Sequence, residues 1–197
     1  TKKQAFPLIA LAAINKTDVS AIAVLEKSDI QRPKELDGKR YASYQARYED
    51  HIVKAMIQSD GGQGDIEISY PDKLGIWETL LMGNADATWI FSNWEGIQAQ
   101  SEGIALRQFR MKDFDIPYAY SPVVAGNQTQ IEKRKEAYQN FMEASKKGFQ
   151  WTAAHPDESI AILQKWIPES DASIDLSQSL ELSVQHWGDL KEWGLME

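Results

Sequence analysis

The period of apolar and polar positions changes repeatedly along the middle of the chain, between about residues 40 and 109. Short stretches with strand character alternate with stretches in which apolar residues recur every three or four positions. The pattern predicts strands over Lys39 to Ser43, Asp65 to Tyr70, Asp86 to Phe91 and Ile104 to Phe109, separated by helices over Arg47 to Ser59, Lys73 to Met82 and from about Asn93. This alternation predicts an α/β unit with a mostly parallel sheet and helices on both faces.

Strand-like runs also flank this unit, and the last third of the chain is helical. The flanking strands are expected at Leu8 to Asn15, Ala21 to Leu25 and Tyr118 to Ala125. They lack enough neighbours to make a second complete sheet. We therefore expect three regions: residues 1–20 as a strand remnant of a first lobe, 21–112 as a complete α/β lobe, and 113–197 as a return to the first lobe.

The helical tail is interrupted at His155-Pro156, where the proline suits the first position of a new helix. A final helix is predicted over about Ser173 to Trp187. The tryptophans of this tail are expected to pack within the first lobe; they are Trp151, Trp166, Trp187 and Trp193.

The stretch Leu80 to Gly96 indicates a small-molecule site. Gly83 and Asn84 are typical of a helix end, and Asp86 to Phe91 of a buried strand. Ser92 or Asn93 is expected to cap the next helix, which puts Trp94 and Glu95 in its first turn at the ligand-binding edge of the sheet. The alternative is that the tryptophan packs in the core and that the helix dipole alone favours the glutamate.

Composition narrows the functional classes. The formal net charge is −8, and the basic residues are interleaved with acids, which argues against a nucleic-acid partner. The chain has no cysteine, hence no thiol nucleophile or thiolate metal site. No apolar run approaches a membrane span, the three histidines lack metal-ligand spacing, and no Gly-x-Ser-x-Gly element occurs. No catalytic residue, metal or cofactor is expected.

Over most of its length the chain resembles the periplasmic substrate-binding proteins of ABC transporters, in the branch that binds thiamine-pyrimidine precursors and is related to the thiamine pyrimidine synthases. The order and spacing of several segments carry the resemblance. They are PLIALAAI (Pro7 to Ile14), AIAVLEKSDIQRPKELDGKRYASY (Ala21 to Tyr44), IVKAMIQSDGG (Ile52 to Gly62), LLMGNADATWIFSNWEG (Leu80 to Gly96), DIPYAYSPVVAGN (Asp115 to Asn127) and GFQWTAAHPDESIAIL (Gly148 to Leu163).

The resemblance implies a type II binding-protein fold, in which two α/β lobes close on a ligand in the cleft between them. The family's opening segments have no counterpart before Thr1, so we expect an incomplete first lobe, which a homodimer would restore. The implied partners are a small heterocycle and the permease subunits of an ABC transporter. The implied location is periplasmic or otherwise extracytoplasmic.

If the family's roles carry over, Glu95 holds the amino edge of an aminopyrimidine and Trp94 walls or stacks on its ring. The turn that follows the first strand of the central unit offers Tyr44, Gln45, Arg47 and Tyr48 as further ligand contacts. Its alternative is that Tyr48 packs beneath the helix and Arg47 is solvated.

Tyr118 and Tyr120 lie near the expected hinge, and strand alternation puts both on one face, towards cleft or core. Trp89 is expected to pack inside its strand, although the same alternation allows it to face the cleft.

The resulting interpretation is a solute-binding protein for a formylamino- or hydroxymethyl-pyrimidine. The enzymatic alternative is a pyrimidine synthase that uses pyridoxal phosphate, but that family's cysteine-rich motif cannot exist in a chain without cysteine. Two further alternatives are a sulfonate or nitrate binder and a dimeric fragment without ligand. A carboxylate at Glu95 favours a neutral or cationic heterocycle over an anion.

Overall fold

The computed structural model describes residues 7–46, 48–71 and 76–196, and the chain divides into two compact units. Unit 1 comprises Thr1–Asp18, Ala119–Trp166 and Leu180–Glu197. Unit 2 comprises Val19–Tyr118 and Ile167–Ser179. Residues 167–179 therefore belong with the central α/β region, whereas the rest of the described helical tail belongs to unit 1.

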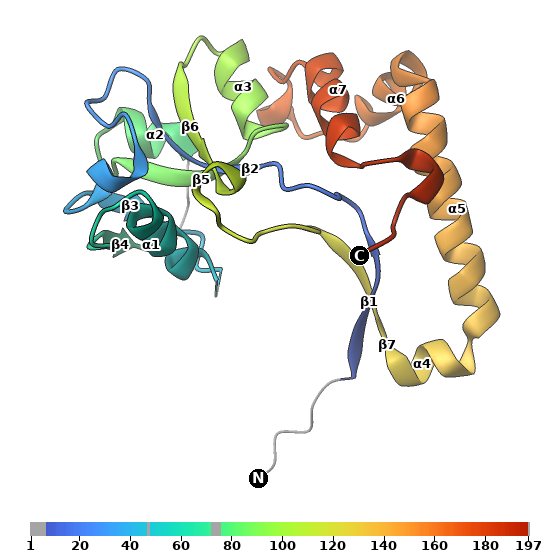
Figure 1. The fold of residues 1–197 in the computed structure, drawn as a ribbon. Coiled ribbons are helices and arrows are strands. Elements are labelled where there is room, and N and C mark those ends of the chain that lie inside the picture. The colour runs from blue at the N-terminus through green and yellow to red at the C-terminus, as the bar shows by residue number, and fades with distance from the viewer. Residues whose placement is uncertain (1–6, 47, 72–75, 197) are drawn as a thin grey trace. The chain divides into compact units, whose positions relative to one another are not determined.

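Unit 2 contains a five-stranded sheet in the order β4-β3-β5-β2-β6 (Figure 1). Its strands are β2 (Ser20–Leu25), β3 (Arg40–Ala42), β4 (Glu67–Ser69), β5 (Ala87–Phe91) and β6 (Leu106–Arg110). β3 runs parallel to both β4 and β5. β2 runs antiparallel to both β5 and β6, so the sheet is mixed.

The position of β2 corrects the expectation of a mostly parallel sheet built from the strands between about residues 40 and 109. β2 lies between β5 and β6, with Ile22 opposite Trp89 on one side and Phe109 on the other. Its first five residues are buried, because both faces of this strand are covered. A continuous apolar run carries no periodicity that specifies its direction or its neighbours, so the central place of β2 could not be predicted.

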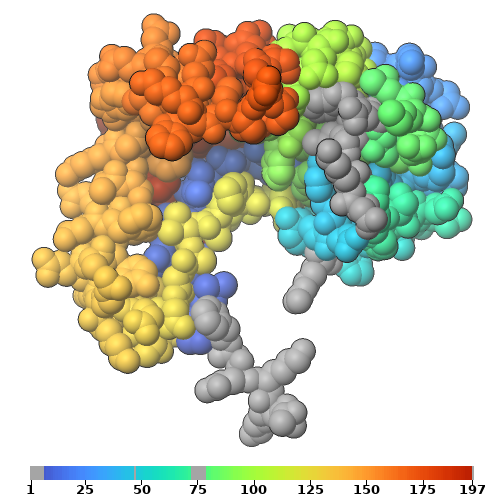
Figure 2. All heavy atoms as spheres, turned by 180° about the vertical axis from the view of Figure 1, so that it is seen from behind, coloured from blue at the N-terminus to red at the C-terminus, as the bar shows by residue number. Residues whose placement is uncertain are grey.

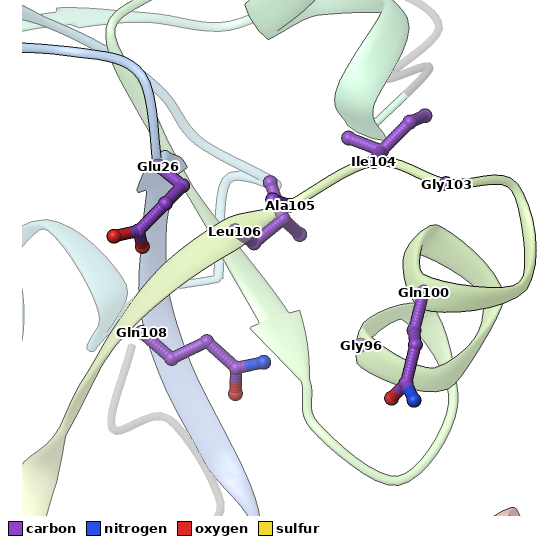
Figure 3. Close-up of a pocket in the computed structure, with 8 residues that line it drawn as sticks. All are labelled: Glu26, Gly96, Gln100, Gly103, Ile104, Ala105, Leu106 and Gln108. Atoms are coloured by element: carbon purple, nitrogen blue, oxygen red, sulfur yellow. The ribbon is translucent and has the colours of Figure 1, made fainter.

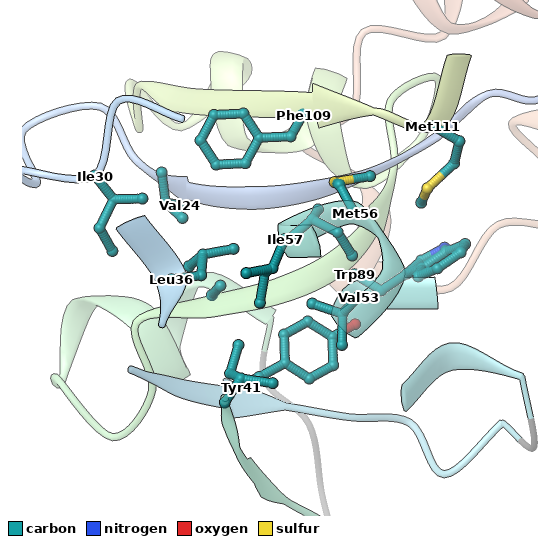
Figure 4. Packing of buried hydrophobic residues seen from close by; sticks show 13 residues of the cluster. Val24, Ile30, Leu36, Tyr41, Val53, Met56, Ile57, Trp89, Phe109 and Met111 are labelled. Carbon is teal, nitrogen blue, oxygen red and sulfur yellow. The ribbon is translucent and has the colours of Figure 1, made fainter. Parts of the chain in front are cut away.

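Helices cover both faces of this sheet. On one face α1 (Glu49–Ser59) buries Val53, Met56 and Ile57 fully, at the spacing expected of a helical stripe. These side chains pack with strand residues in the main core of unit 2 (Figure 4). Each such burial stabilises the fold by roughly 1.5–3 kcal/mol.

The opposite face is covered by α2 (Ile76–Leu81) and α3 (Glu95–Ser101). Leu80 of α2 packs on this face, and Ile90 of β5 lies beside Gly96 of α3. Gly83 ends the α2 region as predicted, with a φ of 68° that only glycine adopts at low cost. The predicted residues 73–75 of this helix lie outside the described residues.

Unit 1 pairs two distant strands. β1 (Leu8–Ala13) lies antiparallel to β7 (Val123–Asn127), with Leu8 opposite Asn127 and Ala13 opposite Val123. The helices of the tail are α4 (Gln128–Lys133), α5 (Lys135–Ala154), α6 (Pro156–Leu163) and α7 (Leu176–His186). Pro156 is the first residue of α6, as predicted.

A small aromatic core holds unit 1 together. Trp187 and Trp193 are buried, and the ring of Phe149 lies 4.7 Å from the first and 4.3 Å from the second, measured between centroids. The expectation that every tail tryptophan packs is wrong for two of them, because Trp151 is 39% exposed and Trp166 is 81% exposed. Helical periodicity identifies apolar stripes but does not show whether a partner covers them.

The predicted strand from Tyr118 to Ala125 is also wrong at its start, because β7 begins at Val123. Tyr120 has a φ of 55°, in the left-handed region, and a cis peptide bond joins Ser121 to Pro122. The regular alternation that would place Tyr118 and Tyr120 on one face is therefore absent.

Candidate ligand-binding site

The carboxyl ends of β3 and β5 lie together, because these strands are parallel neighbours with Ala42 opposite Thr88. Each strand leads into a loop and then a helix, β3 into α1 and β5 into α3. In open α/β sheets this edge is where loops gather around ligands. Two clusters of predicted site residues, around Tyr44 and around Glu95, thus emerge at the same edge.

The turn between β3 and α1 is held by two acidic residues in the first turn of α1. Glu49 is 1% exposed, and its Oε1 accepts a hydrogen bond from the Tyr41 hydroxyl at 2.7 Å. Its Oε2 accepts the backbone N–H of Tyr44 at 3.0 Å. Asp50 accepts the Ser43 hydroxyl at 2.9 Å and the Tyr70 hydroxyl at 2.5 Å. Buried polar groups satisfied in this way fix the conformation of the turn.

Tyr44 and Gln45 are presented by this turn. Gln45 has a φ of 62°, and its N–H donates to the Ser43 hydroxyl at 3.1 Å. Although 46% of Tyr44 is exposed, the pKa of its hydroxyl is raised, first by removal from water and then by the charges of Glu95 and Glu49. The Glu95 carboxylate, which follows the neighbouring strand β5, is thus one of the two charges that act on the Tyr44 hydroxyl.

Glu95 is the first residue of α3 and is half-buried. Its Oε2 accepts the backbone N–H of Phe91 at 2.8 Å, which closes the turn after β5. Burial raises the pKa of this carboxyl group, against the lowering effect of the backbone hydrogen bonds. A carboxylate has about four acceptor positions, so this bond leaves capacity for a ligand.

The N-terminus of α3 differs from the expectation. The residue that caps it is Trp94, which makes no side-chain capping bond, and not Ser92 or Asn93. The Ser92 hydroxyl donates instead to Gln108 Oε1 at 2.6 Å. The Glu95 carboxylate reaches back across the turn to the Phe91 N–H, which is a donor of β5 and not of the helix, so this bond fixes the turn without capping α3.

Three aromatic rings from three separate segments of unit 2 pack beside the β3–α1 turn. The ring of Trp89, in β5, lies 6.3 Å from that of Tyr48 and 5.6 Å from that of Tyr118, between centroids. The Tyr48 and Tyr118 rings are 5.7 Å apart. Trp89 is 5% exposed whereas Tyr48 is 50% exposed, so the aromatic trio has a buried base and an accessible edge. Such an edge can stack on a planar heterocycle.

The structure therefore brings five of the predicted site residues into one region of unit 2. These are Tyr44, Gln45, Tyr48, Trp94 and Glu95, with Tyr118 joined to them through Tyr48. Arg47 lies outside the described residues. Tyr120 belongs to unit 1 and is not part of the site that unit 2 builds.

Sequence reasoning missed the residues that support this region. Glu49 and Asp50 follow Tyr48 directly, and acidic residues in a first helical turn are usually explained by the helix dipole. Only the fold reveals that one of them is buried beneath Tyr41 and Tyr44. Trp89 was expected to pack inside its strand, and it does so at the base of the aromatic trio.

An open pocket of about 420 Å³ lies elsewhere in unit 2, between α3 and β6 (Figure 3). Its polar lining includes Glu26, Gln100 and Gln108. Two of these already have partners, because Glu26 pairs with Arg107 at 2.5 Å and Gln108 accepts from Ser92. Alternation along β6 puts Gln108 on the sheet face opposite Phe109, hence away from the aromatic trio. The chemistry therefore favours the β3 and β5 loops.

Within the described ranges, no helix combines the length and apolar character needed to cross a membrane. Among the same residues, no group of three or more histidine or acidic side chains is arranged to hold a metal ion.

The fold is that of the periplasmic binding proteins. The chain superposes on the periplasmic aliphatic sulphonate binding protein SsuA of Escherichia coli with a TM-score of 0.69, at 18% identity, covering 91% of this chain and 59% of that one. The chain belongs to the family described as NMT1/THI5 like, which matches residues 1–159. This confirms the family and the fold that the sequence resemblance predicted.

Two curated relatives are each 24% identical to the chain. The formylaminopyrimidine-binding protein of Halalkalibacterium halodurans aligns over 178 residues, which is 89% of this chain and 53% of that protein. A putative thiamine biosynthesis protein of Haemophilus influenzae aligns over 161 residues, 79% of this chain and 49% of that protein. The chain thus spans about half the length of these relatives.

Proposed function

We propose that this chain is part of a solute-binding protein of an ABC importer that captures a thiamine-precursor pyrimidine, of the formylamino or hydroxymethyl type. The observation that carries the proposal is that the loops after the parallel neighbours β3 and β5, which hold Tyr44 and Glu95, emerge at one edge of the sheet, where the aromatic trio also packs. The name of the Halalkalibacterium halodurans relative supports the ligand class. Permease subunits are the proposed partners, and the proposed location is extracytoplasmic.

In this proposal the ligand's chemistry matches the site's. An aminopyrimidine has a flat ring, which stacks on an exposed aromatic side chain such as Tyr48. Its ring nitrogen and exocyclic amino group are adjacent, so the Glu95 carboxylate can accept two hydrogen bonds from that edge when the ring is protonated. Trp94, beside Glu95, closes one side. Closure of the binding lobes over the ligand would then present it to the permease.

A sulfonate or nitrate ligand fits these residues less well. The candidate site in unit 2 holds three acidic residues, Glu49, Asp50 and Glu95. Glu95 is half-buried at the site edge, where an anion would face a like charge that water screens only in part. No chemical turnover is expected, because binding and presentation require no bond to break. A pyridoxal absorbance band in the purified protein would contradict that expectation.

The test is a calorimetric titration with a hydroxymethyl aminopyrimidine and, separately, with a short alkanesulfonate. Binding of the pyrimidine alone is expected. Glu95→Gln should weaken it by roughly 1.5–3 kcal/mol, or about 10- to 150-fold, the cost of a lost charged hydrogen bond. Glu181→Gln, at an exposed position of α7, is the matched control and should bind as the wild type does. Preference for the sulfonate would refute the proposal.

A further inference from the structure

A third strand ends at the edge of the sheet that carries the candidate site. β4 is parallel to β3, with Ala42 opposite Ser69, so Tyr70 leaves β4 beside the point where Ser43 leaves β3. The Ser43 N–H donates to the Ser69 carbonyl at 2.9 Å, which continues the pairing past the end of β3. The loops after β4, β3 and β5 therefore open at one edge, and Tyr70 belongs to it.

The Tyr70 hydroxyl is held by Asp50, in the first turn of α1. It donates to Asp50 Oδ2 at 2.5 Å, while Oδ1 of the same carboxylate accepts the Ser43 hydroxyl at 2.9 Å. Ser43 in turn accepts the N–H of Gln45, in the turn of the candidate site. The Tyr70 hydroxyl is thus linked through one carboxylate to the end of β3. Figure 2 shows α1 and β4, in cyan to green, next to each other at the surface of unit 2.

The bond to Asp50 fixes what the Tyr70 hydroxyl can offer a ligand. A phenol has one hydrogen to donate and a carboxylate can only accept, so that hydrogen points at Asp50. Bonds of this length between a hydroxyl and a carboxylate are strong. The bond also raises the pKa of Tyr70, so the hydrogen stays on the phenol at neutral pH. The oxygen that remains can accept a hydrogen bond but cannot donate one.

A second acceptor lies at the end of the strand on the other side of β3. Glu95 Oε2 is 2.8 Å from the N–H of Phe91, the last residue of β5. Neighbouring strands are about 4.8 Å apart, and the carboxylate that holds the Tyr70 hydroxyl also holds Ser43 at the end of β3. The two acceptors therefore belong to the ends of neighbouring strands, a spacing that adjacent substituents of one aromatic ring can bridge.

We propose that Tyr70 determines the specificity of the candidate site, because its hydroxyl accepts a hydrogen bond from an N–H or O–H group that the pyrimidine carries beside its amino edge. The inference rests on the proposed function and narrows it to pyrimidines with such a donor. A hydroxymethyl or a formylamino group supplies the donor. A methyl group has none, and an aldehyde supplies only an acceptor, whose lone pairs would face those of Tyr70.

Calorimetric titrations of the full chain with three aminopyrimidines test the proposal. The three ligands carry a hydroxymethyl, a methyl or an aldehyde group at the same ring position. The wild type should bind the hydroxymethyl compound about 3- to 10-fold more tightly than the other two, as one neutral hydrogen bond allows. Tyr70→Phe keeps the ring but removes the acceptor, so it should bind all three with similar affinity. Tyr138→Phe, which removes a hydroxyl from unit 1, is the matched control and should keep the wild-type preference.

The outcomes separate this inference from the proposed function. Equal binding of the three pyrimidines by the wild type would overturn the role of Tyr70 and leave the proposed function standing. An equal loss for all three ligands in Tyr70→Phe would do the same, because a hydroxyl that only stabilises the loop after β4 does not distinguish between ligands. A wild type that binds none of the three would refute both. The ligand series on the wild type needs no variant, so it decides the question even where a substitution disturbs folding.

Discussion

The buried carboxylate of Glu49 gives the sharpest stability prediction. Glu49→Gln keeps the shape of the side chain but replaces one acceptor oxygen with an NH2 group. In the folded protein that group would face either the Tyr44 N–H or the Tyr41 hydroxyl, which now donate at 3.0 Å and 2.7 Å. A hydrogen bond to a charged group contributes about 1.5–3 kcal/mol, so we expect the free energy of unfolding to fall by that amount.

Urea unfolding followed by circular dichroism measures this loss. Tyr41→Phe removes the hydroxyl while keeping the ring, and its combination with Glu49→Gln completes a double-mutant cycle. The cycle should give a coupling of about 1 kcal/mol or more, because the two groups share a bond. Glu67→Gln, at an exposed position on β4, should change stability by no more than about 0.5 kcal/mol. If Glu49→Gln falls within that same limit, the turn is not held as described.

Substitutions at four single positions give further expected outcomes. Burial raises the pKa of Glu95 in the folded protein, so ionisation of this group lowers the free energy of unfolding as pH rises above the unfolded value of about 4.3. Glu95→Gln removes the ionisable group and should reduce that loss of stability. Thermal melts from pH 4 upward measure the difference. Gly83→Ala should lower the free energy of unfolding by about 1 kcal/mol, because φ at this position is 68°. Gly148→Ala lies in a helix with open space around it and should raise the free energy of unfolding by up to about 1 kcal/mol. Urea titrations of dilute protein measure both changes. Tyr48→Ala should weaken pyrimidine binding by roughly 1 kcal/mol in calorimetry, with Tyr138→Ala in unit 1 as the unaffected comparison.

The parts of the fold that local patterns determine were predictable. The stop at Gly83, the buried strand β5 and the helix after it follow from residue types within a few positions of each other. They were enough to bring Trp94 and Glu95 to the edge of the sheet. The first turn of α6 at Pro156 is of the same kind.

The parts that depend on distant partners were not predictable. β2 is apolar on both faces, and its six residues carry no signal that it pairs antiparallel with β5 and β6, which begin more than 60 positions further along the chain. Tyr118 and Tyr120 were predicted to share a face of a strand, but Tyr120 adopts a left-handed conformation and β7 begins only at Val123. The exposure of Trp166 depends on what lies against it, which periodicity does not report.

The candidate site shows the same division. Glu95 was identified from its place after a strand, but its bond to Phe91 and the effect of its charge on Tyr44 required the parallel pairing of β3 with β5. Glu49 was missed because first-turn acids are common on helix surfaces, and its burial follows from the tyrosines of a neighbouring strand and turn.

The most direct test of the proposed site is a crystal structure of the protein with a hydroxymethyl aminopyrimidine bound. The ring should lie against Tyr48, with its amino edge within hydrogen-bond distance of the Glu95 carboxylate. A ring bound in the pocket between α3 and β6, or any pose in which Glu95 and Tyr48 make no contact with it, would contradict the account.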